Sequence, residues 1–329
     1  MKKKISLVTG GAGFIGSHTV DNLIENNYEV RVIDNLLNSN LNNLQKHNND
    51  SNLKFENLDI NKVTGNEKIF NDVDYVFHFA GIGDIVPSIE NPKDYFKTNL
   101  NGTINILEGV RNKNIIKLVY AASSSCYGLA NTPTDEFHKI NTEYPYALSK
   151  YLGEQATFHW GKVYKLNVNS IRIFNAYGRR VKTKGAYGAV FGVFFKQKLE
   201  AKPLTIVGDG KQTRDFIYVT DIADAFFKLS TSQIKNDFFN LGTGKPQTIN
   251  YLAKLIGGEI IYIPKRPGEP DSTWADITKI KKMANWKPKI NFEKGVKTMI
   301  NNIQDWKDSP LWDKNSIELA TKKWFEYLG

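Results

Sequence analysis

Short apolar segments of strand length alternate with longer amphipathic segments through the first half of the chain. Apolar residues recur at helical intervals over 14–27 and 95–113, and these stretches predict helices. Five segments rich in aliphatic and β-branched residues predict strands over 2–10, 28–36, 53–60, 74–81 and 116–125. Strands and helices that alternate in this order build a parallel sheet with helices on both faces. The pattern therefore predicts an α/β fold.

Glycines follow the first predicted strand where the first helix begins. In VTGGAGFIGSH, Gly10, Gly13 and Gly16 have GxxGxxG spacing, and Phe14 and Ile15 open the helix. The first glycine permits a tight turn, the second lets the backbone approach a diphosphate, and the third lets the helix lie close to the strand. The anion then sits at the helix N-terminus. A P-loop for ATP or GTP is not expected, because it needs a lysine directly after its last glycine.

The second predicted strand, YEVRVIDNL, ends in Asp34, and Asn35 follows it. Asp34 lies close to the separation of about 20 residues at which a carboxylate reaches the adenosine ribose of a dinucleotide. This carboxylate would accept hydrogen bonds from both ribose hydroxyls and would repel a 2′-phosphate. No arginine stands beside it, so the sequence favours NAD over NADP.

Polar and small residues mark the ends of the next predicted strands. Ligands of open parallel sheets gather at the carboxyl ends of the strands. We therefore expect the cofactor to run along the ends of the third and fourth strands, at Asp59, Ile60, Phe79, Ala80 and Gly81. Ser123, at the end of the fifth strand, lies at the same edge of the sheet.

The segment YPYALSKYLGEQ places Tyr146 and Lys150 four residues apart, so on a helix they share one face. A phenol titrates near pH 10, and it serves as a base near neutrality only where positive charge favours the phenolate. Lys150 and an oxidised nicotinamide would supply that charge, while the Ser123 hydroxyl would share the proton. The segment thus indicates acid-base chemistry beside a dinucleotide.

Charge and composition narrow the class of partner. The 329 residues carry a formal net charge of +10, but the lysines are spread along the chain among acids and asparagines. This distribution indicates a solvated surface that suits an anionic small substrate, and no nucleic-acid partner is expected. Cys126 is the single cysteine, and the five histidines show no ligand spacing, so we expect neither a disulfide nor a metal. No apolar run approaches the ~18 residues of a membrane span, and no leader is recognised; we expect a cytoplasmic protein without a membrane partner.

These motifs together resemble the extended short-chain dehydrogenase/reductase family, in particular its nucleotide-sugar epimerases and dehydratases. The resemblance covers nearly the whole chain, through VTGGAGFIGSH, TNLNGT, SSSCYG, YALSK, RIFNAYG, GDGKQTRDFIYVTDIADAF, FNLGTG and RPGEPDSTWAD. It implies a Rossmann-type doubly wound parallel sheet with a smaller α+β substrate-binding lobe. The domains would interleave, with residues 1–175 and 216–245 binding NAD and residues 176–215 and 246–329 binding the nucleotide sugar.

The resemblance also implies roles for individual residues. Tyr146 would be the catalytic base, Lys150 would bind the nicotinamide ribose and tune Tyr146, and Ser123 would hydrogen-bond the sugar hydroxyl. Thr98 or Asn99 would lie near the cofactor. Two arginines would hold the diphosphate, because a guanidinium binds phosphate through paired hydrogen bonds. The implied substrate-binding residues are Ser124, Ser125, Asn175, Arg214, Arg266 and Thr273.

The resemblance implies a redox epimerisation at C4 of a nucleotide-diphosphate sugar. Tyr146 would take the 4-OH proton, hydride would move to tightly bound NAD, and after the 4-keto sugar turns over the hydride would return to the other face. Dehydratases and decarboxylases typically carry acids where this chain has Ser124 and Ser125, because their proton transfers need a carboxyl group. A net 4-dehydrogenase, a 4-keto-sugar reductase or a 4,6-dehydratase stays an alternative. A regulator that binds NAD without catalysis is disfavoured, because such proteins normally lose the Tyr and Lys pair.

Three further expectations concern the periphery of the site. Family members form dimers through a four-helix interface, which the helices around 99–112 and 146–164 would supply here. Thr273, seven residues after Arg266, would line the space beside the sugar C2 substituent, and its small side chain would admit an N-acetyl group. Residues 81–84 depart from the family's small apolar residues and border the sugar. Trp306, Trp312 and Trp324 in the C-terminal tail are interpreted as packing residues.

Overall fold

A parallel sheet of seven strands forms the centre of the molecule. The computed structural model describes residues 3–183, 190–265 and 270–328. The strand order is β3-β2-β1-β4-β5-β6-β11, and every neighbouring pair is parallel. The strands are β1 (Ile5–Thr9), β2 (Glu29–Asp34), β3 (Leu53–Asn57), β4 (Tyr75–His78), β5 (Lys117–Ser123), β6 (Val168–Ile173) and β11 (Asp237–Leu241). The predicted α/β fold is confirmed, and the order reverses beside β1, where such sheets bind dinucleotides.

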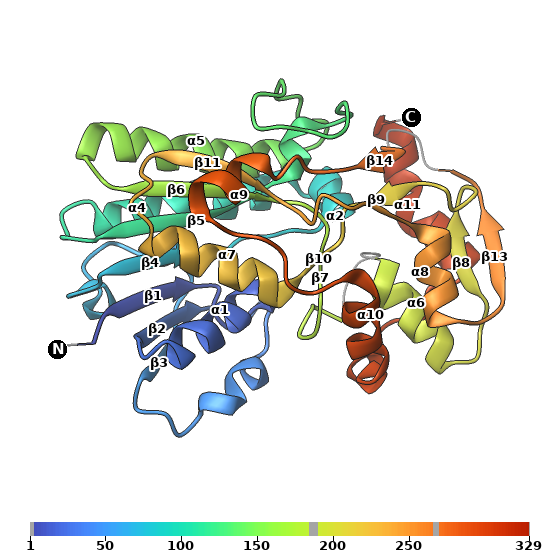
Figure 1. Ribbon diagram of the computed structural model, residues 1–329, viewed down its shortest axis with the longest axis horizontal. Coiled ribbons are helices and arrows are strands. Elements are labelled where there is room, and N and C mark those ends of the chain that lie inside the picture. Colours follow the sequence, from blue (N-terminus) through green and yellow to red (C-terminus); the bar gives the residue numbers. More distant parts are fainter. Residues whose placement is uncertain (1–2, 184–189, 266–269, 329) are drawn as a thin grey trace.

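Helices cover both faces of this sheet (Figure 1). One face carries α1 (Phe14–Glu25) and α7 (Val219–Thr231), and the other carries α4 (Thr103–Val110) and α5 (Pro145–Tyr164). Successive side chains of a strand point to opposite faces. Val8 of β1 therefore packs in the core beneath α1 and α7, whereas its neighbour Leu7 packs in the core beneath α4 and α5.

The helix predicted over 95–113 is interrupted. The structure has α3 (Pro92–Phe96), then a π-helical segment η4 (Lys97–Gly102), and then α4. Thr103 Oγ1 donates to the Asn99 carbonyl at 2.7 Å. The sequence pattern missed this change because π turns keep the chain helical and alter only the direction of its side chains; they are frequent near functional sites.

A second, smaller lobe lies beyond the carboxyl edge of the sheet (Figure 1). Its core is aromatic, with Phe194, Phe195 and Trp306 fully buried. It contains β7 (Ala176–Tyr177), α6 (Val190–Leu199), β8 (Leu204–Val207), β9 (Thr213–Arg214), β10 (Ile217–Tyr218), β12 (Gln247–Thr248), α8 (Ile249–Ile256), β13 (Ile260–Ile263), β14 (Ser272–Thr273), α10 (Phe292–Ile300) and α11 (Lys314–Leu328).

The chain leaves the central sheet and returns to it. After β9 and β10 it runs through α7, which packs against α1, and then adds β11 at the edge beside β6. Helix α9 (Thr278–Ala284) also packs against β11. Elements distant in sequence thus share one layer, as the interleaved domains require. The division at 175/176, 215/216 and 245/246 stays a prediction.

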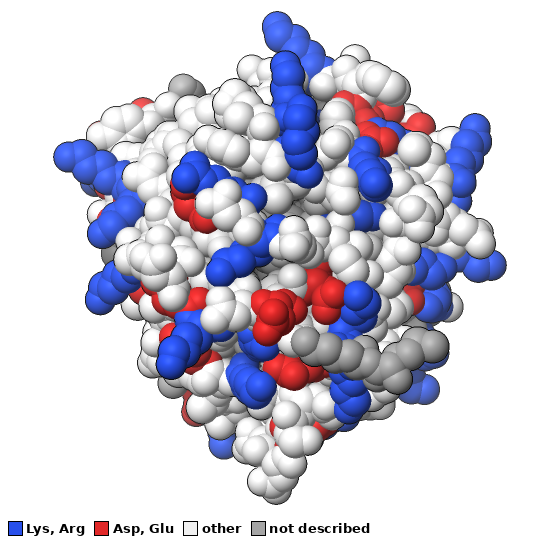
Figure 2. Space-filling view, turned by 90° about the vertical axis from the view of Figure 1, so that its left-hand side faces the viewer, with Lys and Arg blue, Asp and Glu red and all other residues white. Residues whose placement is uncertain are grey.

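The surface carries mixed charge. On the face drawn in Figure 2, lysines and arginines are scattered among acidic and uncharged residues. Among the described helices, none is long and apolar enough to cross a membrane.

Candidate active site

The glycine turn forms a narrow passage between β1 and α1. Gly10 has φ +66°, and a Cβ on it would lie 2.8 Å from the Ala80 nitrogen. A Cβ on Gly16 would lie 2.2 Å from the Gly10 carbonyl oxygen, and one on Gly13 would lie 3.1 Å from the same atom. Helix α1 can therefore approach β1 this closely only if these three positions carry no side chain. Gly13 is the N-cap of α1, so the first helical N–H groups of Phe14 and Ile15 lie at the turn.

Asp34 lies at the end of β2, beside this turn, and is buried. Its carboxylate accepts hydrogen bonds from the Ala12 nitrogen at 3.1 Å, the Leu36 nitrogen at 2.9 Å and Ser39 Oγ at 2.6 Å. These bonds hold the carboxylate beside the glycine turn. Asn35 is exposed, and its side-chain oxygen accepts from the Leu37 nitrogen at 3.1 Å.

Residues at the ends of β3 and β4 line the same edge. Asp59 caps a short helix by accepting from the Asn61 nitrogen at 2.8 Å, and Ile60 is buried. The Phe79 ring lies 4.5 Å from the Phe226 ring, and the Ala80 nitrogen donates to Thr9 Oγ1 at 3.2 Å. The predicted cofactor-binding residues of these two strands therefore lie at the carboxyl edge of the parallel sheet.

Asn99 is fully buried in the π-helical segment. Its amide nitrogen donates to the Ile82 carbonyl at 3.0 Å and to Ser149 Oγ at 3.0 Å, while its oxygen accepts from the Ile82 nitrogen at 2.8 Å. Asn99 therefore ties the loop after β4 to helix α5. A Cβ on Gly81 of that loop would lie 2.8 Å from Asn99 Oδ1 and 3.7 Å from Lys150 Nζ.

Helix α5 presents Tyr146 and Lys150 on one face, with Ser123 opposite at the end of β5. Lys150 Nζ lies 4.4 Å from the centre of the Tyr120 ring. Burial lowers the pKa of Lys150 to about 7, against the influence of the Glu154 carboxylate. Burial also raises the pKa of the half-buried Tyr146, while its hydrogen bond with Ser123 favours the phenolate and opposes that rise. Tyr146 and Ser123 therefore share a hydrogen bond at the sheet edge, and Lys150 lies one helical turn from Tyr146.

A buried ion pair supports this helix one turn further on. Glu154 and Arg172 are both buried, with 2.7 Å between Glu154 Oε2 and Arg172 Nη2. Ser170 Oγ donates to Glu154 Oε1 at 2.7 Å, and Arg172 Nη1 donates to the Tyr127 hydroxyl at 2.8 Å. The pair fastens α5 to β6. The sequence analysis missed it, because Glu154 reads as an exposed helical residue.

Aromatic rings flank Tyr146 on two sides. The Tyr144 ring is parallel to the Tyr146 ring, with 6.4 Å between centroids and an interplanar angle of 7°. The Tyr95 ring lies 6.4 Å away at 77°. Asp84 is close enough to raise the pKa of both Tyr146 and Tyr95. Tyr95 and Tyr144 were missed by the sequence analysis, although Tyr144 stands two residues before Tyr146 in the same motif.

The serine cluster after β5 faces the same region. The Ser125 nitrogen donates to Ser123 Oγ at 3.2 Å, and the Ser125 hydroxyl is hydrogen-bonded to the Tyr144 phenol. Ser124 begins the short helix that follows β5. These side chains provide hydroxyls near Tyr146 and no carboxylate. Cys126 beside them is buried, which raises the pKa of its thiol to about 12.

Three predicted substrate-binding residues come together in the second lobe. Strand β14 pairs with β9 so that Thr273 lies opposite Arg214. Thr273 Oγ1 donates to Asn175 Oδ1 at 2.6 Å. Arg214 is buried, and its Nη1 donates to the Thr213 carbonyl at 2.9 Å. Arg266 lies outside the described residues.

Asp215 anchors this group. It is fully buried and accepts from the Thr243 nitrogen at 2.7 Å, the Gly244 nitrogen at 3.0 Å and the Ala275 nitrogen at 3.1 Å. It therefore joins the strand that carries Arg214 to the turn after β11 and to the segment after Thr273.

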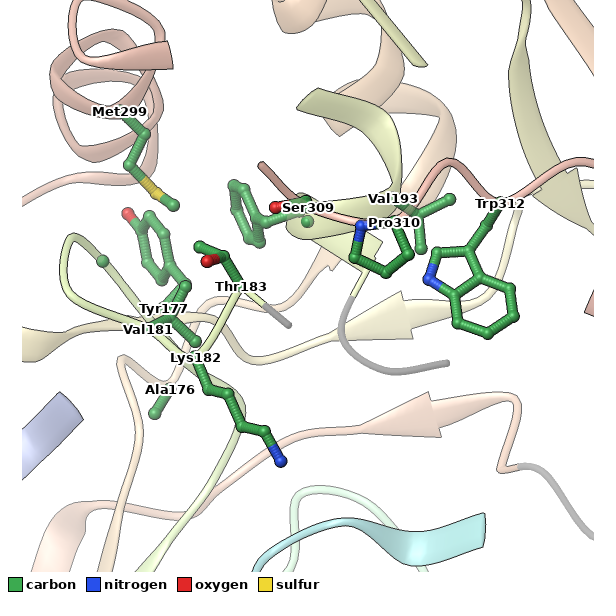
Figure 3. A pocket seen from close by; sticks show the side chains of 13 residues that line it. Ala176, Tyr177, Val181, Lys182, Thr183, Val193, Met299, Ser309, Pro310 and Trp312 are labelled. Carbon is green, nitrogen blue, oxygen red and sulfur yellow. The ribbon is translucent and has the colours of Figure 1, made fainter. Parts of the chain in front are cut away.

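Two of the cavities that described residues line lie in the second lobe. One of about 470 Å³ contains three basic side chains, and its lining residues are Val207, Gly208, Asp209, Lys211, Gln212, Arg214, Lys265, Pro270 and Asp271. The other, of about 60 Å³, is lined mainly by apolar and aromatic residues including Tyr177, Phe191 and Met299 (Figure 3). Lys182 at its rim points away from it and donates to Asn38 Oδ1 at 2.8 Å. In the described part of the chain, no group of three His, Cys, Asp or Glu side chains is arranged to hold a metal.

A family model described as the NAD dependent epimerase/dehydratase family matches residues 6–242. Among curated relatives, a putative UDP-glucose 4-epimerase of Methanocaldococcus jannaschii is 42% identical over 304 residues, covering 90% of this chain and 97% of that protein. UDP-glucuronic acid decarboxylase 4 of Arabidopsis thaliana is 31% identical over 318 residues, covering 92% of this chain and 70% of that protein.

Solved structures that are similar to this chain include 4-epimerases of UDP sugars. A UDP-N-acetylglucosamine 4-epimerase from Methanobrevibacter ruminantium, in complex with UDP-N-acetylmuramic acid, has a TM-score of 0.86 and 33% identity, covering 93% of this chain and 98% of that one. A UDP-glucuronic acid 4-epimerase from Bacillus cereus, in complex with UDP-glucuronic acid and NAD, has a TM-score of 0.85 and 28% identity, covering 91% and 99%. The Rossmann-type fold is thereby confirmed.

Proposed function

Because the chain belongs to the NAD-dependent epimerase/dehydratase family, we propose that it is a UDP-sugar 4-epimerase. The observation that carries the proposal is the meeting of Tyr146, Lys150 and Ser123 at the carboxyl edge of the sheet, beside the glycine turn. The relatives that support it include 4-epimerases that match nearly the full length of both chains.

NAD is the cofactor of this family, and the residues present fit it. Gly10 and Gly16 let α1 begin close against β1, so that the first N–H groups of α1 lie at the turn where a diphosphate binds, and Asp34 is held beside that turn for a ribose. When bound, NAD supplies the acceptor and the donor for the hydrogen at C4. The residues that would hold it are Gly10, Gly13, Phe14, Ile15, Gly16, Asp34, Asn35, Asp59, Ile60, Phe79, Ala80, Gly81, Asn99, Tyr146 and Lys150.

Proton transfer falls to residues of this chain. The Tyr146 phenolate takes the proton of the sugar 4-hydroxyl, which Ser123 also hydrogen-bonds, and later returns it. Burial opposes the phenolate, whereas the hydrogen bond with Ser123 favours it. A positive charge on Lys150, one helical turn away, would favour it further. Asn99 contributes indirectly, because its bonds to Ile82 and Ser149 hold the loop after β4 against α5.

The second lobe would hold the nucleotide and orient the sugar. Arg214 borders the cavity of about 470 Å³, and its guanidinium suits a diphosphate, whereas Lys211 and Lys265 of the same cavity are paired with Asp209 and Asp271. Asn175 and Thr273, joined by their hydrogen bond, would contact the sugar, as would Ser124 and Ser125. Arg266 would bind the same diphosphate, as the family resemblance implies.

Helices α4 and α5 would form the interface of a homodimer. Their sheet-facing sides are buried, while Leu148, Val163 and Tyr164 of α5 are large apolar residues exposed to solvent in the single chain. A four-helix contact between two copies would cover these side chains.

Decarboxylation and dehydration are the competing reactions, because decarboxylases are also similar to this chain. Hydroxyls rather than carboxylates at Ser124 and Ser125 favour epimerisation. The test is to incubate the protein with UDP-glucose, UDP-N-acetylglucosamine and UDP-glucuronic acid and to analyse the products by NMR and mass spectrometry. A 4-epimer of unchanged mass is expected. Loss of carbon dioxide or water, or stoichiometric consumption of NAD, would contradict the proposal.

A further inference from the structure

The last helix of the chain contacts both lobes. Near its start, Ile317 of α11 is buried against Val207 and Ile263, at the ends of β8 and β13. Just before it, the Trp312 carbonyl accepts a hydrogen bond from Gln197 Nε2 at 2.7 Å. Further along, α11 packs against α2 (Ile85–Glu90), which follows β4 of the central sheet. Figure 1 shows α11 between α2 and the β8–β13 pair. This helix therefore runs from β8 and β13 of the second lobe to α2, which follows β4 of the central sheet.

The buried side chains of α11 lie on one face of the helix. Ile317, Thr321 and Trp324 are 3%, 1% and 7% exposed, whereas Leu319 and Phe325 are 76% and 42% exposed. The buried residues are spaced four and three apart, which places them on one side of a helix. The contact with α2 and Tyr144 is thus made by the apolar face of an amphipathic helix.

The contact reaches the proposed base through one intermediate ring. The Trp324 ring lies 6.0 Å from the Tyr144 ring at 45°. Tyr144 in turn lies parallel to Tyr146 at 6.4 Å, and its hydroxyl is hydrogen-bonded to Ser125. Offset and tilted rings at these separations attract one another. Trp324, Tyr144 and Tyr146 therefore form a continuous stack from the C-terminal helix to the proton-transfer group.

We propose that Trp324 is a positioning residue, which holds Tyr146 through Tyr144 and closes this side of the site to water. The inference rests on the proposed function, because it takes Tyr146 as the base. A base must lie within hydrogen-bond reach of the proton it removes, and a displacement of about 1 Å costs roughly a hundredfold in rate. Tyr146 lies in the first turn of α5, where the backbone restrains it least. The stack of Trp324, Tyr144 and Tyr146 restrains the Tyr146 ring, in addition to the hydrogen bond with Ser123.

Three other groups affect the pKa of Tyr146: Ser123 at the end of β5, Asp84 before α2 and Cys126 after β5. Lys150 lies one helical turn away on α5. Tyr95 and Tyr144 flank the ring. None of these groups belongs to α11, so a substitution of Trp324 removes none of them; it acts on Tyr146 by releasing the ring contact with Tyr144 and by admitting water.

The experiment compares Trp324→Ala, Trp324→Phe and Phe325→Ala in the NAD-loaded protein. Phe325→Ala is the matched control, because it removes an aromatic ring from the adjacent, more exposed position of the same helix. Two readouts are taken: kcat and KM for a UDP sugar, and the pKa of Tyr146 from ¹³Cζ-tyrosine NMR, with the resonance assigned through Tyr146→Phe. The NMR titration requires no turnover.

Trp324→Ala should lower kcat roughly tenfold to a hundredfold with little change in the affinity for UDP alone. It should also move the pKa of Tyr146 downward, because water would relieve the desolvation that raises it. Trp324→Phe should bring kcat and the pKa of Tyr146 most of the way back to the wild-type values. Phe325→Ala should resemble the wild type in both quantities. An unchanged Tyr146 pKa in Trp324→Ala, or an equal effect of Phe325→Ala, would overturn the inference. If the wild type turned over no UDP sugar, the proposed function would fail, and the NMR titration would still decide whether Trp324 controls Tyr146.

Discussion

The Thr273 hydroxyl donates a hydrogen bond to the side-chain oxygen of Asn175 at 2.6 Å, across two segments almost a hundred residues apart in sequence. Strand β14 sets this contact, because its pairing with β9 places Thr273 opposite Arg214. The side chain proposed to limit the width of the sugar pocket is thus bonded to another residue proposed to touch the sugar. A substitution at Thr273 changes both the available space and the orientation of Asn175.

Thr273→Tyr should selectively reduce kcat/KM for a 2-acetamido UDP sugar while largely sparing its 2-hydroxy analogue. Overpacking a pocket costs roughly 1 to 3 kcal/mol, or about tenfold or more in rate. Thr273→Val is the control, since it removes the hydrogen bond to Asn175 without adding bulk. Equal losses for both sugars, or no wild-type activity on the acetamido sugar, would show that Thr273 does not limit the pocket; residues 81–84 would then be the better candidates.

Tyr146→Phe should retain NAD and lose turnover. The ring would still stack on Tyr144, whereas the ionisable hydroxyl would be absent. Acid-base catalysis typically contributes a factor of about 10² to 10⁴, so a loss of that size is expected. Bound NAD is measured by absorbance after denaturation, and product by NMR. Near-normal turnover would refute the proposed role of Tyr146.

Gly16→Ala should lose NAD and lower the free energy of unfolding. Its Cβ would lie 2.2 Å from the Gly10 carbonyl oxygen, so α1 would have to move away from β1. A strained core substitution of this kind costs roughly 1 to 3 kcal/mol. Gly83→Ala is the matched control, because a Cβ there meets no described atom within 4 Å. Calorimetry measures the affinity for NAD, and urea unfolding measures the free energy of unfolding. Similar results for the two variants would contradict the close approach of α1 to β1.

Lys150→Met should stabilise the cofactor-free protein at pH 6 relative to the wild type. Burial lowers the pKa of Lys150 to about 7 from its unperturbed value of 10.5, so between these values the unfolded chain binds more protons. The lysine then costs stability fully below pH 7, and this cost disappears as the pH rises toward 10.5. Urea unfolding at pH 6 and pH 9 tests the sign, because the advantage of methionine should shrink at the higher pH. The same variant should lose turnover. An advantage that grows with pH would contradict the burial argument.

Val163→Glu should convert a dimer into a monomer. Val163 is 48% exposed on α5 in the single chain, and a carboxylate buried in a four-helix contact would be unpaired. Light scattering at micromolar concentration measures the mass. Leu319→Glu is the control, because Leu319 is exposed on α11, away from that interface. A monomeric wild type would contradict the proposed assembly.

The sequence by itself determined the elements whose signals are local. The period of apolar residues and the glycine spacing specified β1, α1 and β2, because a strand, a tight turn and a helix are decided within a few residues. Asp34 could be predicted for the same reason, since its distance from the glycine turn is set by one strand-helix-strand unit. Tyr146 and Lys150 needed only the helical repeat to share a face.

Only the tertiary structure decided which distant segments meet. The burial of Asp215, the ion pair of Glu154 with Arg172 and the bond between Thr273 and Asn175 depend on how strands and helices pack. Trp324 reads as an ordinary packing residue in sequence, and its place on Tyr144 follows from the passage of α11 between the lobes. The period of apolar residues predicts which face of a helix is buried. It does not predict the element that covers this face, because the free energy of the whole packed chain decides which elements pack together.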